Sequence, residues 1–272
     1  MSRILVTGAD GFLGKEVIGI LKKNNFEFVG VSRKNTRENY LFCDLSIPND
    51  VLKLLEKTEP DVIINLAASI DFKERDIKLF FPVNVLLPSI LGNYCKQNHL
   101  FFVHSSSIIV HGFSHELYNL NTELLPDTGY GKSKLLADDV IAASGCESSI
   151  LRLGGIYGEN GPFHLGINKA IDDAKKRKLP TVVGTGEAKR NYIYVKDAAQ
   201  AILHCIKERL NGIHYLGGEE KTIRDMLSDI CEVLIPGQLP KHIKGEKTKD
   251  QIVENSPYFE TTSFRTAIEE IV

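Results

Sequence analysis

The chain has 272 residues, of which 43% are hydrophobic and 25% are charged. This mixture is typical of a globular protein and argues against a disordered or fibrous chain. Its 33 basic and 35 acidic residues leave a net charge of -2, so we expect neither nucleic acid nor an anionic membrane as a partner, because both are usually bound by a basic surface.

Other features of the sequence bear on the compartment. No charged and apolar leader precedes the first apolar run, and no apolar stretch approaches the roughly 18 residues that would span a membrane. The five cysteines are scattered and contain no CxxC pair. We therefore expect a cytoplasmic protein with reduced thiols, without a disulfide framework or a metal site.

Short apolar runs and amphipathic segments alternate through the first 155 residues. The predicted strands are 3–6, 26–31, 61–68, 100–103 and 149–153, and the predicted helices are 12–23, 48–57, 82–96 and 130–143. The strands are almost continuously apolar, which indicates burial on both faces. This alternation predicts an α/β fold with a doubly wound parallel sheet of the Rossmann type.

The pattern changes after residue 155. Helices are predicted at 165–178, 195–208, 222–233 and 264–272, with a strand at 212–216 and a polar, irregular stretch at 236–262. We expect a dinucleotide-binding domain over 1–155 and a small substrate-binding cap over 156–272. Part of the cap, about 190–216, is expected to pack back on the first domain, so that the cap is interleaved with the sheet.

The segment TGADGFLG follows the first predicted strand and opens the first predicted helix. In this context Gly8 permits the tight turn, Gly11 lets the backbone approach a pyrophosphate, and Gly14 allows the helix to pack closely on the strand. The start of the helix, at Phe12 and Leu13, presents amide groups and the positive end of the helix dipole to phosphates. The segment predicts a dinucleotide site.

The end of the second predicted strand bears on which dinucleotide binds. An acidic residue that would hold the ribose hydroxyls of NAD is expected there, but the residues are Ser32, Arg33 and Lys34. Two cations after a small hydroxyl residue suit a 2′-phosphate, which favours NADP(H), with NAD as the alternative. The alternative is that Arg33 and Lys34 are ordinary loop cations.

Two Tyr-x-x-x-Lys pairs occur, and their predicted backbone separates them. Tyr130 and Lys134 lie in a helical pattern, where positions i and i+4 face the same way. A lysine so placed can lower the pKa of the phenol and make it a usable acid or base. Tyr192 and Lys196 lie in a β-rich stretch, where four residues span roughly 13 Å, too far for such coupling.

An ordered set of further motifs accompanies these pairs. They are NLAAS at 65–69, PVNVLLPSILGNYC around Asn84, HSSSIIVHG at 104–112, YGKSK at 130–134, LRLGGIYG at 151–158 and RNYIYVKDAAQAI at 190–202. With the glycine loop, the set resembles the extended short-chain dehydrogenase/reductase family, the NAD(P)-dependent epimerases and dehydratases that act on nucleotide sugars. The resemblance covers about residues 1–216.

The resemblance implies catalytic roles for particular residues. Ser107 matches the hydroxyl that polarises the reacting sugar oxygen, Tyr130 matches the proton donor or acceptor, and Lys134 matches its partner. Arg190 matches a residue that contacts the nucleotide diphosphate of the substrate.

The resemblance also implies cofactor contacts. Asp44, with Leu45 beside it, matches the acid that holds the adenine. The tract Leu66, Ala67 and Ala68 matches the segment that lies against the cofactor.

Asn84 corresponds to an asparagine in a kinked helix, whose main-chain carbonyl holds a water in the proton relay of the lysine. Pro88 stands four residues later and has no amide hydrogen to donate to that carbonyl. We hypothesise that Pro88 keeps the carbonyl of Asn84 available. The alternative is a helix that begins only after Pro88.

The chain also departs from the family pattern. Ile108 and Ile109 replace the Asp-Glu pair of dehydratases after the catalytic hydroxyl, and aliphatic side chains cannot protonate a leaving hydroxide. His111 stands where tyrosine is frequent and is either a titratable pocket residue or a packed one. Gly155 replaces an asparagine that usually contacts the sugar.

These observations favour reduction of a 4-keto nucleotide sugar with NADPH. A nucleotide-sugar 4-epimerase with tightly bound NAD also fits the motifs. A catalytically silent NADP(H)-binding sensor or scaffold is the alternative from another class. The 130–143 segment carries apolar residues on more than one face. The resemblance implies that this helix joins a four-helix bundle, so we expect a homodimer.

Overall fold

The structure of the chain is a computed structural model, and it describes residues 3–34, 38–246 and 248–271. The described residues divide into two compact units. Unit 1 contains the chain up to Ser114 together with Glu123–Arg152 and Ala199–His214, and unit 2 contains His115–Thr122, Leu153–Ala198 and the chain from Tyr215 onward. The division into a cofactor-binding domain and a cap near residue 155 stays a prediction.

The central sheet organises unit 1. Among the described residues it has seven strands, in the order β12-β7-β5-β4-β1-β2-β3. Their bounds are β1 (Arg3–Thr7), β2 (Glu27–Ser32), β3 (Tyr40–Phe42), β4 (Val62–Asn65), β5 (Phe101–Ser107), β7 (Ser148–Leu153) and β12 (Gly212–Leu216). The pairs β1–β2, β1–β4, β2–β3 and β4–β5 are all parallel.

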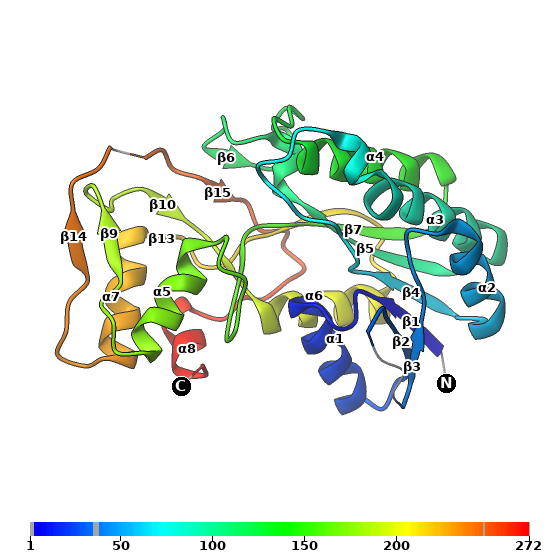
Figure 1. Cartoon of the computed structure of the whole chain (residues 1–272), viewed down its shortest axis with the longest axis horizontal. Coiled ribbons are helices and arrows are strands. Elements are labelled where there is room, and N and C mark those ends of the chain that lie inside the picture. Colours follow the sequence, from blue (N-terminus) through cyan, green and yellow to red (C-terminus); the bar gives the residue numbers. More distant parts are fainter. Residues whose placement is uncertain (1–2, 35–37, 247, 272) are drawn as a thin grey trace. The chain divides into compact units, whose positions relative to one another are not determined.

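The predicted Rossmann-type α/β fold class is confirmed. The strand interiors explain why, because Leu5, Ile63 and Phe102 of the three central strands are completely buried. Buried apolar residues on consecutive positions are what a parallel sheet covered on both faces requires. Figure 1 shows α2, α3 and α4 on one face of the sheet and α1 and α6 on the other.

The helices of the sheet follow the predicted segments closely. Their bounds are α1 (Phe12–Lys23), α2 (Pro48–Thr58), α3 (Leu87–Asn98), α4 (Gly129–Ser144) and α6 (Val195–Glu208). The segment predicted as one helix over 82–96 is in fact composite. A π-helical segment η2 (Phe81–Leu86) runs into α3, and Pro88 stands in the first turn of α3.

The topology places a switch point at β1. Strand β1 lies between β2, which follows it in the chain, and β4, which comes later, so the winding direction of the sheet reverses there. Ligands of open α/β sheets bind outside the carboxyl ends of the strands at such a switch point. The carboxyl ends of β1 and β4 therefore mark the expected ligand site, and β5 lies next to β4.

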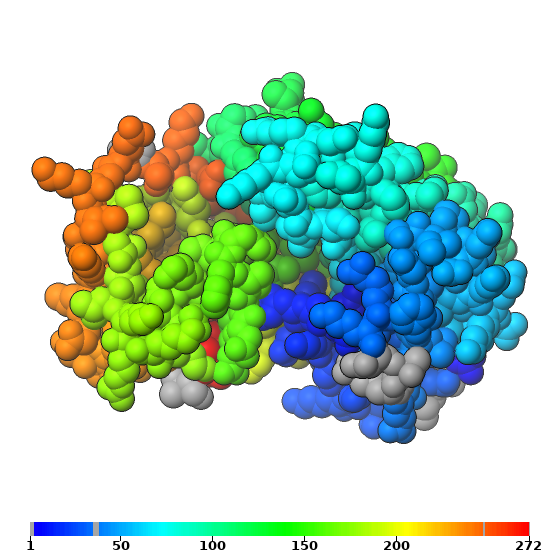
Figure 2. Space-filling view, viewed as in Figure 1, coloured from blue at the N-terminus to red at the C-terminus, as the bar shows by residue number. Residues whose placement is uncertain are grey.

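Unit 2 is built from helices and short strands. These are β6 (Leu117–Tyr118), β8 (Ile156–Tyr157), α5 (Gly166–Lys175), β9 (Thr181–Val183), β10 (Lys189–Arg190), β11 (Ile193–Tyr194), β13 (Lys221–Thr222), α7 (Ile223–Leu234), β14 (Lys241–Ile243), β15 (Ile252–Val253) and α8 (Phe264–Glu269). Tyr157 and Phe264 pack in its core with ring centroids 5.0 Å apart. Strand β14 is exposed throughout, and its orange atoms are visible on the surface in Figure 2.

The second Tyr-x-x-x-Lys pair does not lie in one strand, so that expectation was wrong. Strand β11 contains only Ile193 and Tyr194, and α6 begins at Val195. Lys196 therefore stands in a helix, where its Nζ lies 2.9 Å from Oε2 of Glu270. The strand ends early because the β-rich sequence runs directly into the amphipathic helix.

Within the described ranges, no helix combines the length and the apolar character needed to cross a membrane.

Candidate active site

The glycine loop connects β1 to α1. Gly8 has a φ of +67°, and a Cβ there would come within 2.7 Å of the amide nitrogen of Ala67. A Cβ on Gly14 would overlap the carbonyl oxygen of Gly8. The turn and the close packing that the spacing predicts are therefore both present, and the turn lies against the Leu66–Ala68 tract that follows β4.

The start of α1 suits a bound phosphate. Gly11 is the N-cap residue, and no described side chain caps the helix by a hydrogen bond. Gly11 is exposed, and a Cβ there would meet only the carbonyl oxygen of Gly8, at 3.0 Å. Amide groups at the helix start, including those at Phe12 and Leu13, can thus be approached by the pyrophosphate of a dinucleotide.

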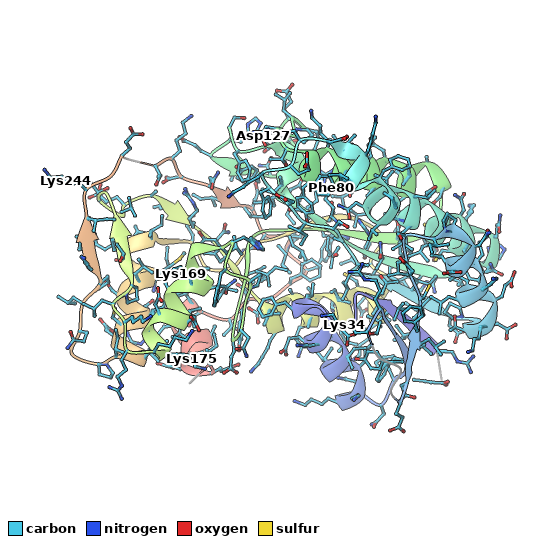
Figure 3. The ribbon with its side chains drawn as sticks, in the orientation of Figure 1. Lys34, Phe80, Asp127, Lys169, Lys175 and Lys244 are labelled. Atoms are coloured by element: carbon cyan, nitrogen blue, oxygen red, sulfur yellow. The ribbon has the colours of Figure 1, made fainter. Side chains whose placement is uncertain are left out.

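The residues expected to select the cofactor lie at the end of β2. Ser32 is buried, and its Oγ accepts a hydrogen bond from the amide of Lys34 at 3.1 Å. Arg33 and Lys34 are exposed (Lys34 is labelled in Figure 3). Two exposed cations therefore lie in a turn that is anchored by a buried hydroxyl.

Asp44 lies beside these cations. Its Oδ1 accepts hydrogen bonds from the amide and the hydroxyl of Ser46, at 3.0 and 2.7 Å. These bonds, and to a smaller extent the charge of Arg33, lower the pKa of the Asp44 carboxyl. The acid expected at the adenine, with Leu45 buried next to it, is therefore an ionised group.

Tyr130 lies in the first turn of α4. The hydroxyl of Thr128 caps this helix by accepting a hydrogen bond from the amide of Gly131 at 2.9 Å, which fixes the backbone next to the phenol. The ring is packed edge-on against Phe72 and Phe80, with centroids 5.3 and 6.4 Å away (Phe80 is labelled in Figure 3).

This packing decides the protonation of Tyr130. Burial raises the pKa of the phenol to about 12, although a hydrogen bond with Ser107 lowers it and the charge of Asp138 raises it further. The spacing of Tyr130 and Lys134 predicts that the lysine lowers this pKa, but in the structure the hydrogen bond with Ser107 is what lowers it. At neutral pH the phenol carries its proton, so it is poised to act as a proton donor.

Lys134 is 1% exposed and lies one turn after Tyr130 on α4. Its Nζ donates a hydrogen bond to the carbonyl oxygen of Ser105 at 2.5 Å and lies 3.4 Å from Nε2 of His104. Burial lowers the pKa of Lys134 from 10.5 to about 8, and the charge of Asp138 opposes the decrease. A lysine with this pKa can exchange a proton near neutral pH.

Asn84 is buried in η2 and connects two parts of the site. Its side chain accepts from the amide of Ser69 at 2.7 Å and donates to the carbonyl oxygen of Ser69 and to Oγ of Ser133, each at 2.9 Å. Ser133 precedes Lys134 on α4. Asn84 therefore ties the loop after β4 to the helix that carries Tyr130 and Lys134.

Two other positions singled out in the sequence lie in defined surroundings. His111 is fully buried, and its Nδ1 lies 2.9 Å from the carbonyl oxygen of Glu123, which is the geometry of a packed residue. A Cβ on Gly155 would come within 2.8 Å of the Tyr192 ring. The space that an asparagine would need at Gly155 is thus filled by an aromatic side chain.

Arg190 belongs to unit 2, on β10, whereas the other predicted site residues belong to unit 1. Its Nη1 donates to the carbonyl oxygens of Lys189 and Lys249, at 2.7 and 2.5 Å. These bonds hold the guanidinium group within unit 2. Its contact with a nucleotide diphosphate stays a prediction.

Three buried residues of the site were not predicted. His104 contacts Lys134, and Asp138 follows Lys134 by one further turn of α4. Asp138 pairs with Arg152 of β7 at 3.0 Å, with both side chains almost fully buried. The i+4 spacing of Lys134 and Asp138 was a usable signal for this carboxyl, but the positions of Arg152 and His104 depend on the folded sheet.

Comparisons with known proteins agree with this geometry. Residues 4–217 match the model of the NAD dependent epimerase/dehydratase family. The dTDP-glucose 4,6-dehydratase of Salmonella typhimurium is 24% identical over an alignment that covers 85% of this chain and 76% of that protein. The GDP-6-deoxy-D-talose 4-dehydrogenase of Aggregatibacter actinomycetemcomitans is 28% identical, over 85% of this chain and 80% of that protein.

Solved structures show the same fold. The UDP-N-acetylglucosamine 4-epimerase from Bacillus cereus superposes with a TM-score of 0.86. The alignment covers 100% of this chain and 98% of that one, at 24% sequence identity.

Proposed function

Because the chain belongs to the NAD-dependent epimerase/dehydratase family of extended short-chain dehydrogenases/reductases, we propose that it reduces a 4-keto nucleotide sugar with NADPH. The observation that carries the choice of cofactor is the Ser32-Arg33-Lys34 turn. Its two cations are exposed at the end of β2, where an acid would be needed to bind the ribose of NAD. A 2′-phosphate is stabilised by such cations and would be repelled by an acid.

The residues of unit 1 supply the remaining chemistry. When bound, NADPH supplies the hydride. Ser107 donates a hydrogen bond to the ketone oxygen and polarises it, and Tyr130 transfers its phenolic proton to the alkoxide that develops. A phenol whose pKa is raised to about 12 holds this proton at neutral pH, and Lys134 then returns a proton to the phenolate.

The residues after Ser107 argue against 4,6-dehydration. The similar Salmonella protein is a dehydratase, but here Ile108 and Ile109 begin the short helix η3 (Ile108–His111) directly after Ser107. Neither side chain can donate a proton to a leaving hydroxide. The proposed reaction therefore ends at the alcohol.

The proposal includes the partners and the location of the enzyme. The substrate is a nucleotide-diphosphate sugar whose diphosphate contacts Arg190, and the enzyme works as a cytoplasmic homodimer. The similar proteins support the class of substrate, since their names specify dTDP-glucose and GDP-6-deoxy-D-talose.

Epimerisation at C4 is the second proposal, and the solved epimerase with the same fold favours it. In that reaction Tyr130 first removes a hydroxyl proton while NAD accepts the hydride. The cofactor must stay bound while the keto sugar rotates in the site, until the hydride returns to its other face. The high pKa of the free phenol is less suited to this first step, because a base must give up its own proton before it can accept another.

The cofactor content of the purified protein separates the two reactions. We expect protein without bound nucleotide that binds NADPH at least tenfold more tightly than NADH and reduces 4-keto nucleotide sugars. The double variant Arg33→Ala/Lys34→Ala should lose this preference. Stoichiometric NAD that is released only on denaturation would instead establish the epimerase.

The Tyr130→Phe variant tests whether the chain is an enzyme at all. It should bind NADPH normally and lose more than 99% of the reductase activity, since only the proton donor is removed. A protein that binds NADPH but turns over no member of a nucleotide-sugar panel, with or without this substitution, would be a sensor or scaffold.

A further inference from the structure

A chain of buried polar side chains runs from the glycine loop to Lys134. It contains Thr7 at the end of β1, Asn65 at the end of β4, His104 on β5 and Lys134 on α4. None of the four is more than 1% exposed. Thr7 Oγ1 lies 2.6 Å from Asn65 Oδ1, Asn65 Nδ2 lies 3.0 Å from His104 Nδ1, and His104 Nε2 lies 3.4 Å from Lys134 Nζ.

The first two members define the direction of the hydrogen bonds. Thr7 Oγ1 accepts the amide of Ala67 at 3.3 Å and donates its own hydrogen to Asn65 Oδ1. The amide nitrogen of Asn65 then faces His104 Nδ1, and an amide nitrogen can only donate. Nδ1 of His104 is therefore an acceptor.

This direction selects the tautomer of His104. A neutral imidazole carries one hydrogen, so with Nδ1 accepting, the hydrogen resides on Nε2. Burial, and to a smaller extent the charge of Lys134, lower the pKa of His104 well below its ordinary value, so the ring is neutral. The Nε2–H group consequently points at Lys134 Nζ.

An N–H donor opposite Nζ favours one protonation state of the lysine. An uncharged amine can accept this hydrogen bond while it donates to the carbonyl oxygen of Ser105, but an ammonium group has no lone pair with which to accept. Asp138 on α4 acts in the opposite direction, although its carboxyl is paired with Arg152 of β7. Tyr130 faces the site as a neutral phenol.

We propose that His104 is a positioning residue that orients Lys134 and favours its uncharged amine, and that Asn65 and Thr7 set this role by selecting the Nε2–H tautomer. The inference rests on the proposed function: a lysine that favours its uncharged amine is, when protonated, a stronger acid toward the Tyr130 phenolate, and this matters for catalysis only if Lys134 makes that transfer. It explains why β1, β4 and β5 each contain a completely buried polar side chain, at Thr7, Asn65 and His104. It also links the residue before Gly8 to the proton relay.

The tautomer is measured on the unchanged full-length chain. Long-range ¹H–¹⁵N spectra of protein labelled with ¹⁵N-histidine distinguish a hydrogen on Nε2 from one on Nδ1, and His104→Gln assigns the signal. His242→Gln, on exposed β14, is the matched control for the labelling. We expect a neutral Nε2–H ring from pH 6 to pH 9. An Nδ1–H ring would overturn the proposal.

A titration of ¹³Cε-labelled lysine then measures the effect on Lys134, with Lys134→Met as the assignment variant. Asn65→Asp places an acceptor opposite Nδ1. The hydrogen of the ring then resides on Nδ1, and Nε2 faces Nζ as an acceptor. The midpoint of Lys134 should rise by about one pH unit. His104→Gln can accept from Asn65 and donate to Nζ, so it should leave the midpoint near that of the wild type.

The charge of the new aspartate needs its own control. In a His104→Leu background, Asn65→Asp changes the charge but has no imidazole to reorient. If the midpoint rises as much in that background as in the wild type, His104 has no such role. These readouts need no substrate, so they test the role of His104 even if the proposed reaction is wrong. Failure of the reductase assay alone would contradict the proposed function and not the tautomer.

Discussion

Tyr130 and Lys134 show how burial acts on two neighbouring groups in opposite ways. Removal from water opposes charge, so it raises the pKa of the phenol and lowers the pKa of the ammonium group. Both shifts bring the pair closer to a state in which neither group is charged. The proposed proton donor thereby lies next to a lysine whose pKa of about 8 leaves it partly protonated near neutral pH, so that it can replenish the phenol.

The lowered pKa of Lys134 predicts how stability depends on pH. Between about 8 and 10.5 the unfolded chain binds the proton of this lysine and the folded chain does not. The free energy of unfolding contributed by Lys134 therefore rises with pH through this window and is smallest at neutral pH.

We expect the free energy of unfolding of Lys134→Met, relative to that of the wild type, to fall by about 2 kcal/mol between pH 7 and pH 10, because only the wild type gains stability from Lys134 in this range. Chemical denaturation of both proteins at several pH values checks this difference, and other titrating groups cancel in the comparison. A difference that does not change with pH would mean that the lysine has an ordinary pKa.

At the scale of elements, α1 shows why glycine is needed at one position and not at another. Gly14 and Gly19 both lie in this helix. A Cβ on Gly14 would overlap the carbonyl oxygen of Gly8, whereas a Cβ on Gly19 would meet no atom within 4 Å. The close approach of α1 to the loop therefore depends on the absence of a side chain at Gly14 only.

The two glycines form a matched pair of variants. Gly14→Ala should destabilise the protein by about 1–3 kcal/mol, because the helix must shift away from the loop, and it should weaken NADPH binding at least tenfold. Gly19→Ala should stabilise the protein by about 0.5–1 kcal/mol, because alanine is the better helix former. Thermal unfolding and cofactor titration measure both effects. Equal behaviour of the two variants would contradict the proposed packing.

At the scale of the whole molecule, each unit has its own interior. The core of unit 1 is the two-sided sheet, and the core of unit 2 is the packing of helices α5, α7 and α8 with short strands (Figure 1). Every proposed catalytic residue belongs to unit 1. The proposed proton chemistry can thus be tested on residues of unit 1 independently of the contact proposed for Arg190 in unit 2.

The proposed homodimer is a property of the whole molecule. Leu136 of α4 is 39% exposed, which suits a helix that contributes to a bundle between subunits. Light scattering at micromolar concentration should give twice the chain mass of 30.3 kDa. Leu136→Glu should shift the protein toward the monomer. Leu52 on α2 is similarly exposed, and Leu52→Glu should leave the dimer intact. A monomeric wild type would contradict the proposal.

Local sequence determined much of this protein. The α/β fold class, the glycine turn and the position of Tyr130 and Lys134 on one helical face could all be predicted, because periodicity and short turns are encoded within a few residues of one another. The helix bounds of α1 and α6 and the bounds of β12 agree with the predicted ones for the same reason.

Only the tertiary structure decided the chemistry around Lys134. Thr7 and Asn65 are 58 residues apart, Asn65 and His104 are 39 apart, and His104 and Lys134 are 30 apart. They meet because parallel strands bring their carboxyl ends to one edge of the sheet, and no local pattern shows which polar side chains will face each other there. Burial in the assembled sheet also sets the protonation of His104 and Lys134. Their protonation states therefore follow from the tertiary structure and not from the local sequence.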